Sequence, residues 1–329
     1  MTETLQAGEL ERELETYRPE LTAYAYRMLG SAFEAEDAVQ DALLRAWKSY
    51  EGFEGRSALR SWLYRITTNV CLDMLNSRER RALPMDLGPA QSADSPLPAP
   101  LPEVTWLEPI PEARVSGGGS RGGSGGDPAE VAELRESIRL AFVAALQHLP
   151  PNQRAVLILR EVLRWKAEEV SELLETSVAS VNSALQRARA ALAKVEATEP
   201  LRPDDDEQKA LLARYVEAFE RYDMEKLTAL LREDATWSMP PFDLWLQTHE
   251  DVVKWCLGPG IGCRGSRLIP TVANGMPAFG QYKPSPEGGL APWSLQVLSV
   301  SGGEITGICF FLDTERLFPL FGLPDRLDA

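Results

Sequence analysis

The sequence predicts a multidomain protein in which two all-α domains are followed by a C-terminal α+β domain. Residues 8–83 and 127–195 show the helical spacing of apolar residues, with few prolines or glycines. Prolines and glycines are concentrated between these two blocks, and Trp-, Gly- and Val-rich segments that favour strands follow the second block. A chain of 329 residues has room for this arrangement, since a domain takes roughly 100–200 residues.

Composition restricts the class of protein. Hydrophobic residues make up 44% of the chain and charged residues 25%, which is typical of a soluble globular protein. No apolar run approaches the roughly 20 residues that cross a bilayer, and the acidic N-terminus does not have the form of a secretory signal. We therefore expect a cytoplasmic protein without a membrane partner.

The net charge of −15 bears on any function that involves nucleic acid. The phosphate backbone repels so acidic a chain, which argues against unassisted nonspecific DNA binding. A DNA-binding function must therefore depend on local basic surfaces, or on a partner that supplies positive charge.

Cysteine and histidine are too few and too scattered to indicate a metal site. The cysteines form no CxxC pair, so the sequence predicts buried reduced thiols, with no metal and no cofactor. The residues concerned are Cys71, Cys256, Cys263, Cys309, His148 and His249.

The first helical block contains a helix with two distinct faces. Ser31 and Glu34 have the spacing of a capping box and predict its start. Val39, Leu43 and Trp47 recur at the spacing of one buried face. Considered alone, the opposite face is simply solvent-exposed; it carries Glu36, Asp37, Gln40, Asp41 and Arg45.

A second helix starts near Arg56 and combines an apolar stripe with a basic and aromatic face. The stripe consists of Leu59, Trp62, Leu63, Ile66 and Val70. The outward residues are Arg56, Arg60, Ser61, Tyr64, Arg65 and Asn69. Basic, aromatic and amide side chains together suit single-stranded DNA, because they neutralise phosphates, stack on bases and bond base edges. A generic amphipathic helix has the same composition, so the pattern leaves both interpretations open.

The segments YRPELTAYAYRMLGSAFEAEDAVQDALLRAW and FEGRSALRSWLYRITTNVCLDMLNSRERR resemble region 2 of extracytoplasmic-function (ECF) sigma factors. The resemblance implies that the first helix grips the clamp helices of RNA polymerase, through Asp37, Gln40, Asp41 and Arg45. It implies that the loop and second helix melt the promoter −10 element, through Arg56, Ser57, Arg60, Trp62, Arg65 and Asn69. Trp62 also belongs to the apolar stripe, so a packing role is equally open.

The second block has the pattern of a helix-turn-helix. The inward residues of its two helices are Val170, Leu173 and Leu174, then Val178, Val181, Leu185 and Leu192. Glu175 and Thr176 supply the turn, and Ser177 caps the second helix. No acidic residue falls between Ser177 and Lys194, which suits a helix in the major groove. A helical hairpin that binds another protein remains the alternative.

LQHLPPNQRAVLILREV and EEVSELLETSVASVNSALQRARAAL are similar to sigma region 4. In that family, region 4 reads the −35 element and contacts the polymerase flap. The resemblance implies −35 contacts at Ser177, Ser180, Asn182, Ser183, Gln186, Arg187 and Arg189.

The segment between the blocks is expected to be a linker, because its prolines remove backbone donors and favour extended geometry. It is acidic, and in the resembled family an acidic linker threads the RNA channel of the polymerase; a plain solvated tether explains the composition as well. The expected boundaries are 8–85 for region 2, 86–128 for the linker, 129–196 for region 4 and 207–325 for the last domain.

The C-terminal segment EQKALLARYVEAFERYDMEKLTALLREDATWSMPP resembles the start of SnoaL-like folds, which are cone-shaped α+β domains. Strands are expected near 235–239, 265–272, 278–283, 293–300 and 305–312. Either a small-molecule pocket or a packed core accounts for Trp237, Trp245, Trp255, Phe279, Trp293 and Phe310. Acid–base candidates are Asp234, Asp243, His249 and Asp313, but no spacing singles one out, and we expect no catalytic residue.

The leading hypothesis is a sigma factor that binds core RNA polymerase, recognises −35 and −10 elements and promotes DNA melting, modulated by its C-terminal domain. It has no chemistry of its own. The alternative is a polymerase-independent helix-turn-helix regulator, with a C-terminal domain that senses a small molecule or acts as a cyclase- or isomerase-like enzyme.

Overall fold

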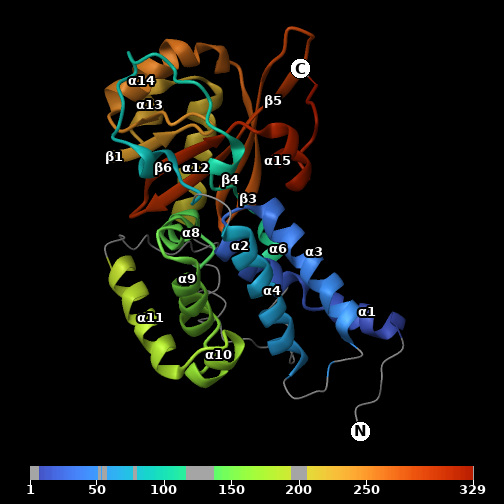
Figure 1. Ribbon diagram of the computed structural model, residues 1–329. Coiled ribbons are helices and arrows are strands. Elements are labelled where there is room, and N and C mark those ends of the chain that lie inside the picture. The colour runs from blue at the N-terminus through green and yellow to red at the C-terminus, as the bar shows by residue number, and fades with distance from the viewer. Residues whose placement is uncertain are drawn as a thin grey trace. The chain divides into compact units, whose positions relative to one another are not determined.

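The computed structural model describes residues 7–50, 53, 58–76, 80–115, 137–193 and 206–328 (Figure 1). These residues form two compact units. The first unit comprises the described parts of Met1–Arg81 and Leu107–Glu196, and the second those of Ala82–Trp106 and Ala197–Ala329. Both predicted helical domains therefore belong to one unit, whereas part of the predicted linker belongs with the C-terminal domain.

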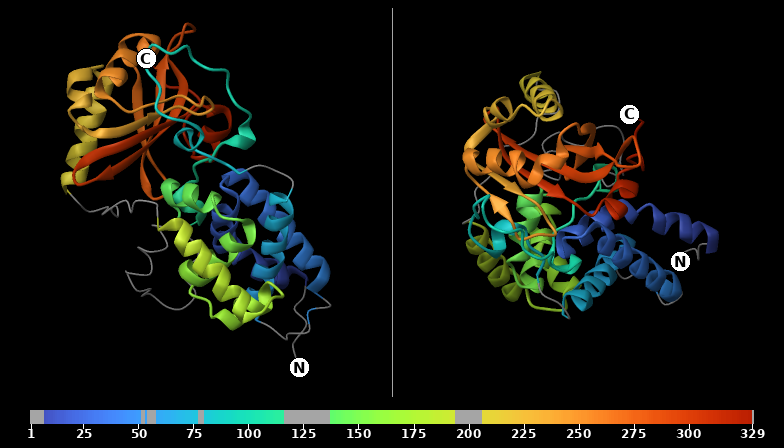
Figure 2. Two further views of the ribbon diagram at one scale, coloured as in Figure 1. Left: turned by 60° about the vertical axis from the view of Figure 1, so that its left-hand side comes forward. Right: turned by 90° about the horizontal axis from the view of Figure 1, so that it is seen from above.

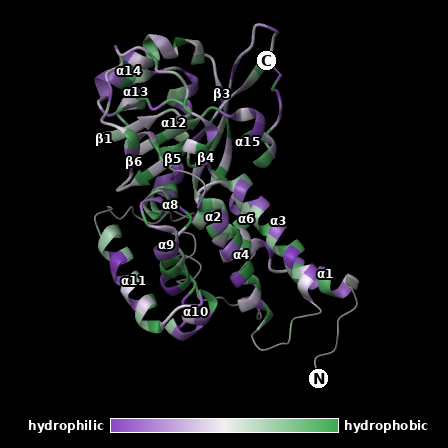
Figure 3. Ribbon diagram, in the orientation of Figure 1, coloured by the Kyte–Doolittle hydropathy of each residue, from purple (hydrophilic) through white to green (hydrophobic). Residues whose placement is uncertain are grey.

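The first unit is built from helices. From region 2 come α1 (Ala7–Glu15), α2 (Arg18–Leu29), α3 (Ala32–Ser49) and α4 (Leu59–Leu75). The linker contributes α6 (Glu112–Val115). Region 4 contributes α8 (Leu140–Gln147), α9 (Pro151–Leu157), the π-helical turn η4 (Ile158–Val162), α10 (Ala167–Leu173) and α11 (Val178–Leu192). Apolar and polar residues alternate along α3 and α11, as expected of amphipathic helices (Figure 3).

Helix α2 is the central helix of this unit. Every residue from Leu21 to Leu29 is buried, because α3, α4, α8 and α9 all pack on it. A helix buried on all sides is a core helix. It ends at Gly30, whose φ of 74° is left-handed and whose missing Cβ leaves room for Leu107. The chain after Leu107 is held here too, since Glu108 N donates to Gly30 O at 3.0 Å.

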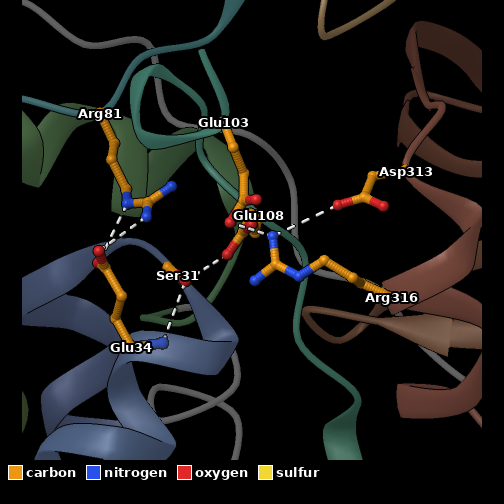
Figure 4. Close-up of polar contacts among 7 residues, drawn as sticks. All are labelled: Ser31, Glu34, Arg81, Glu103, Glu108, Asp313 and Arg316. Atoms are coloured by element: carbon orange, nitrogen blue, oxygen red, sulfur yellow. Dashed lines mark hydrogen bonds and ion pairs between the residues drawn. The ribbon is translucent and has the colours of Figure 1, made fainter.

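The predicted capping box at the start of α3 is present in part. Ser31 is the N-cap, and its hydroxyl accepts a hydrogen bond from Glu34 N at 3.2 Å. The Glu34 carboxylate pairs with Arg81, with Oε1 at 3.0 Å from Nη2 (Figure 4). Ser31 Oγ also donates to the carboxylate of Glu108. The cap therefore fastens three separate segments of the first unit.

Two inferences about buried faces are wrong. Trp47 of α3 was expected inside, but its exposed fraction is 51%. Tyr64 of α4 was expected outside but is fully buried. Helix α4 packs on α2 and α3 on one side and on α9 and α10 on the other, so its buried surface is wider than one apolar stripe.

The second unit is a six-stranded sheet with helices. Its strands are β1 (Leu231–Ser238), β2 (Trp245–Leu246), β3 (Arg267–Ala273), β4 (Met276–Pro284), β5 (Leu290–Ser301) and β6 (Glu304–Phe311). Their order is β2-β1-β6-β5-β4-β3. Strands β1 and β6 are parallel, and the other neighbours are antiparallel. All five expected strands are present, and the two-residue β2 is one that the sequence did not predict.

The helices of the second unit cover this sheet. They are α12 (Asp206–Glu220), α13 (Met224–Thr228), α14 (His249–Leu257), the 3-10 turn η5 (Pro259–Cys263) and α15 (Thr314–Leu320). Helix α12 lies along the sheet (Figure 2), with Tyr215 and Phe219 buried as expected. The Tyr215 ring packs on that of Phe279 of β4, with ring centroids 5.7 Å apart. This interface is the centre of the α+β core.

Residues 82–106, here called the strap, pack on the second unit rather than forming a free tether. The strap contains α5 (Pro84–Leu87) and the 3-10 turn η2 (Glu103–Thr105), and it passes α14 (Figure 1). Ala93 is buried in the core of this unit. Gln91 N donates to Trp245 O at 2.9 Å, and Leu101 N donates to Pro241 O at 2.8 Å. The many prolines of the strap limit its regular structure, because they lack a backbone N–H. Two of the backbone N–H groups that remain, those of Gln91 and Leu101, donate hydrogen bonds to the C-terminal domain.

Candidate functional site

The helix-turn-helix consists of α10, a turn and α11. Glu175 occupies the turn with a left-handed φ of 50°. Ser177 caps α11 as predicted, since its hydroxyl accepts from Ser180 N at 3.1 Å. Val181 and Leu185 hold α11 against α9 and α10. All seven predicted −35 residues are exposed: Ser177, Ser180, Asn182, Ser183, Gln186, Arg187 and Arg189.

The two arginines of α11 are in different surroundings. Arg189 Nη2 lies 2.6 Å from Glu161 Oε1, an ion pair within the domain. Arg187 is exposed and forms no ion pair with another described residue. Arg187 is therefore available to a phosphate or base without breaking a contact, whereas Arg189 must first exchange its carboxylate partner.

The candidate −10 residues on α4 are largely engaged. Arg60 pairs with Glu20 at 2.9 Å, and its guanidinium also lies 5.2 Å from the Tyr64 ring centroid. Arg65 Nη2 donates to the backbone oxygen of Glu172 at 3.3 Å. The Trp62 ring packs on Phe53, with centroids 4.8 Å apart.

The other −10 candidates divide into two groups. Asn69 is exposed on the same helix. Arg56 and Ser57 lie outside the described residues. Of the candidates that the structure describes, Asn69 is therefore the one most open to solvent.

The candidate polymerase-docking residues all lie on one exposed side of α3. Asp37 and Gln40 are exposed, and Gln40 accepts a hydrogen bond from Arg18 at 2.9 Å. Asp41 and Arg45 form an i,i+4 ion pair of 2.8 Å. The four residues that the sequence predicted, Asp37, Gln40, Asp41 and Arg45, are therefore all accessible from solvent at least in part.

Two apolar residues on α3 were missed as candidates. Leu44 and Trp47 have exposed fractions of 46% and 51%, beside Arg45. Exposed apolar side chains that cluster with charged ones are typical of protein-binding surfaces. The spacing of apolar residues did not indicate that Trp47 is exposed, because Trp47 continues the repeat of Val39 and Leu43 on the buried face.

The aromatic residues of the second unit mainly form a packed core. Trp237, Trp255, Phe279 and Phe310 belong to its buried cluster. Trp245 instead donates its indole N–H to Gly88 O of the strap at 2.9 Å. The Lys283 ammonium lies over the Trp293 ring. A surface hollow over α14 is lined by His249, Glu250, Val253, Lys254, Leu257 and Gly258, outside this aromatic core.

The acid–base candidates do not share a site. Asp234 pairs with Arg232 on β1, and Asp313 lies 3.4 Å from Arg316 (Figure 4). His249 Nε2 lies 3.2 Å from Arg232 O, at the start of α14. The Oδ1 atom of Asp243 is buried and has no hydrogen-bond partner among the described residues. Each carboxylate belongs to a separate set of contacts.

No disulfide joins the four cysteines, and three of them are buried: Cys71, Cys256 and Cys309. Burial raises the pKa of Cys256 and of Cys309 to about 12, so both thiols stay protonated at neutral pH. Within the described part of the chain, no group of three or more His, Cys, Asp or Glu residues is placed to hold a metal ion. Among the described helices, none combines the length and apolarity needed to cross a bilayer.

Comparison with known proteins decides the family. The Sigma-70 region 2 model matches residues 14–81, and the Sigma-70 region 4 model matches residues 139–192. The ECF RNA polymerase sigma factor SigG of Mycobacterium tuberculosis is 46% identical over 327 residues, which cover 97% of this chain and 85% of SigG. The chain belongs to the ECF sigma factors.

Other members of this family match over most of the chain. The ECF sigma factor SigJ of M. tuberculosis is 26% identical over 308 residues, which cover 90% of this chain and 89% of SigJ. The crystal structure of SigJ matches with a TM-score of 0.58 and 22% identity, over 97% of this chain and all of that one. Two helical sigma domains and a C-terminal α+β domain with a six-stranded sheet are confirmed, as the sequence predicted.

Proposed function

We propose that this sigma factor binds core RNA polymerase through α3 and promoter DNA through α4 and α11, and that it acts in the cytoplasm. The observation that carries the proposal is the surface of α11. In a chain of net charge −15, this helix and its N-cap residue Ser177 together expose seven polar or basic residues and contain no acidic one. Such a helix suits the major groove, whereas the net negative charge of the whole chain opposes binding to DNA.

Helix α3 is the proposed polymerase-docking element. Its exposed surface combines Leu44 and Trp47 with the charged pair Asp41 and Arg45. Apolar anchors surrounded by charged groups are the composition of protein interfaces, in which an exposed tryptophan often supplies much of the binding energy. This supports a protein partner at α3 and makes a merely solvated face the weaker interpretation.

Helix α4 is the proposed binding surface for the promoter −10 element. Arg60 and Arg65 supply positive charge, Trp62 an aromatic surface and Asn69 an amide that can bond base edges. Arg56 and Ser57 complete the assignment that follows from the family resemblance. Melted DNA would be held here while α11 reads duplex DNA at the −35 element.

We propose that the C-terminal domain regulates the sigma domains by holding the strap, and that it performs no chemistry. Lys254 pairs with Asp94 and Arg316 pairs with Glu103, so two acidic side chains of the linker are engaged by the domain (Figure 4 shows the second pair). The aromatic core is packed and the candidate carboxylates are separated, which gives no support to a catalytic site or an enclosed ligand site.

Run-off transcription with core RNA polymerase on genomic promoter fragments tests the proposal. The chain should direct transcripts from specific start sites, and Arg187→Ala should reduce their yield. A gel shift of the same duplex by the chain alone, at moderate salt, tests the alternative. Binding that is as tight without core enzyme as with it would favour a polymerase-independent regulator.

A further inference from the structure

Part of the proposed DNA-binding side of α4 is covered by the region 4 domain of the same unit. The edge of the Trp165 ring meets Tyr64, with centroids 5.0 Å apart and planes at 61°. The Arg60 guanidinium lies 5.7 Å from the Trp165 ring centroid as well as 5.2 Å from that of Tyr64. Arg65 is bonded to the backbone of Glu172 in α10. While the contact persists, the Tyr64 ring is inaccessible to single-stranded DNA, and the Arg60 side chain, which is 43% exposed, is accessible only in part.

Trp165 is presented by a short loop between η4 and α10. The preceding residue, Arg164, has a left-handed φ of 58°, which is unfavourable for a side chain of this size. Arg160 donates from its guanidinium to the backbone oxygen of Trp165, and Trp165 N donates to Leu159 O at 3.0 Å. The loop is therefore held in a conformation that directs Trp165 at α4, and Trp165 is only 6% exposed.

The contact between Trp165 and α4 leaves more buried hydrogen-bond donors without acceptors than is usual in a permanent protein core. The buried atoms Arg65 Nε, Arg160 Nε and Trp165 Nε1 have no hydrogen-bond partner among the described residues. Buried donors without acceptors oppose folding, and they regain partners in water or against phosphate and base oxygens. Elsewhere between the same two domains, Arg27 donates to Ser137 Oγ at 2.7 Å and Arg154 donates to the backbone oxygen of Met28. Arg65 and Trp165, which meet at the part of the interface on α4, thus each carry a buried donor that lacks an acceptor among the described residues.

We propose that Trp165 is an internal competitor of the −10 DNA strand: it occupies the Arg60–Tyr64 face of α4 in the free protein and leaves it in the complex with polymerase. This deepens the proposed function, since it rests on the assignment of α4 to −10 DNA. An aromatic ring beneath an arginine is also how proteins hold an unpaired base, so the indole and a base compete for one surface. The contact and the net charge together suppress DNA binding by the free chain.

Equilibrium binding of a fluorescent single-stranded oligonucleotide of mixed sequence to the purified full chain tests this. Trp165→Ala should bind about 2- to 12-fold more tightly than the wild type, the factor that an edge-to-face aromatic pair contributes to an equilibrium constant. Trp293→Ala, which removes a tryptophan outside the interface, should bind as the wild type does. The gain should vanish in the double variant Trp165→Ala with Arg60→Ala, which separates unmasking of α4 from general loosening.

Circular dichroism melting checks that each variant is folded, and Trp165→Leu replaces Trp165→Ala where the latter unfolds. With core polymerase present, the difference between Trp165→Ala and the wild type should fall below about twofold, because the partner has already separated the domains. Equal oligonucleotide affinity of folded variant and wild type, or a gain that survives Arg60→Ala, would overturn the inference. Failure of the proposed function looks different: the wild type itself would give no promoter-specific transcript.

Discussion

The carboxylate of Asp251 accepts a hydrogen bond from the backbone N–H of Ala93 at 2.9 Å, which ties the strap to the first turn of α14. The same Oδ1 accepts from Ser92 Oγ at 3.2 Å, and Oδ2 accepts from Thr248 Oγ1 at 2.7 Å. Thr248 is the N-cap of α14, and its hydroxyl in turn accepts from Asp251 N at 3.0 Å. One residue therefore stabilises a helix start and holds a segment far away in the sequence.

Asp251→Ala should loosen the strap without unfolding the domain. The variant loses acceptors for Ala93 N and Ser92 Oγ, and a hydrogen bond to a partly exposed carboxylate contributes about 1 kcal/mol. We expect faster amide exchange at Ala93 and earlier proteolysis between Gly88 and Leu101. Glu250→Ala, which removes the neighbouring carboxylate on the same helix, is the control. Identical exchange in the two variants would contradict this role.

The attachment should also weaken in acid. The hydrogen bond from Ala93 N, followed by those from Thr248 and Ser92, lowers the pKa of the Asp251 carboxyl below its ordinary value of 3.8. A lowered folded-state pKa means that the stabilisation is complete above the ordinary value and is lost as the pH falls through the folded value. The protection factor of the Ala93 amide, which corrects the exchange rate for its intrinsic pH dependence, should fall below about pH 4 when it is followed downward from pH 6. Asp251→Asn should remove this step; a step of equal size in that variant would assign it to another group.

Secondary structure and family were predictable from the sequence, whereas the partners of several surfaces were not. Helical spacing correctly predicted the buried side of α11, and Ser177 correctly predicted where the helix begins. Both were predictable because amphipathic repeats and N-caps are local sequence signals. Tyr64 escaped prediction because a second domain covers the opposite side of α4, and no local pattern reports that. Spacing likewise placed Trp47 in the core, although half of its side chain is exposed, because a periodic repeat does not report how far a buried face extends along the helix.

The strap shows the same limit. Its proline density predicts extended backbone, which is largely what the structure has. The sequence does not reveal that Ala93 is buried in the C-terminal core, because a single alanine between polar residues carries no periodic signal. Asp94 and Glu103 were predicted to belong to a solvated or channel-facing linker. In the structure they form ion pairs with Lys254 and Arg316, which lie on elements distant in sequence.

The two arginines of α11 should differ in their effect on promoter binding. Arg187→Ala should weaken holoenzyme binding by about 1–3 kcal/mol if it contacts a base, or lower the salt slope by about 1 if it contacts phosphate. Arg189→Ala should cost less, since in the free protein Arg189 is paired with Glu161 and must give up that contact. Binding titrations over a range of salt concentrations measure both, and Arg221→Ala, at the residue directly after α12, serves as the charge-matched control outside the interface. Unchanged affinity and salt slope for Arg187→Ala would remove α11 from the DNA interface.

Trp47→Ala should weaken binding to core polymerase while leaving the fold intact. The side chain is half-exposed, so little packing is lost, whereas a tryptophan buried in an interface often contributes 2 kcal/mol or more, on the order of a 30-fold change in affinity. Native gel or fluorescence titration with core enzyme gives the affinity, and the melting temperature reports stability. Leu257→Ala on α14, another exposed apolar residue, should change neither. A large drop in melting temperature with unchanged affinity would make Trp47 structural.

Truncation at Pro203 should raise run-off transcription per bound core enzyme, because it removes every C-terminal partner of the strap. Asp94 loses its ion pair with Lys254, Glu103 loses its ion pair with Arg316, and Ala93 loses the hydrophobic core in which it is buried. The linker is then free to bind along the polymerase. The full chain carrying Lys254→Ala and Arg316→Ala isolates this effect, since it weakens the two ion pairs while the domain stays present. Both proteins should change in the same direction, the point variant less, because exposed ion pairs contribute little individually. Equal yields from full-length and truncated chains would refute a regulatory role for the domain. A fall in yield would show that the domain activates the sigma factor, in which case its hold on the strap is a scaffold and not a restraint.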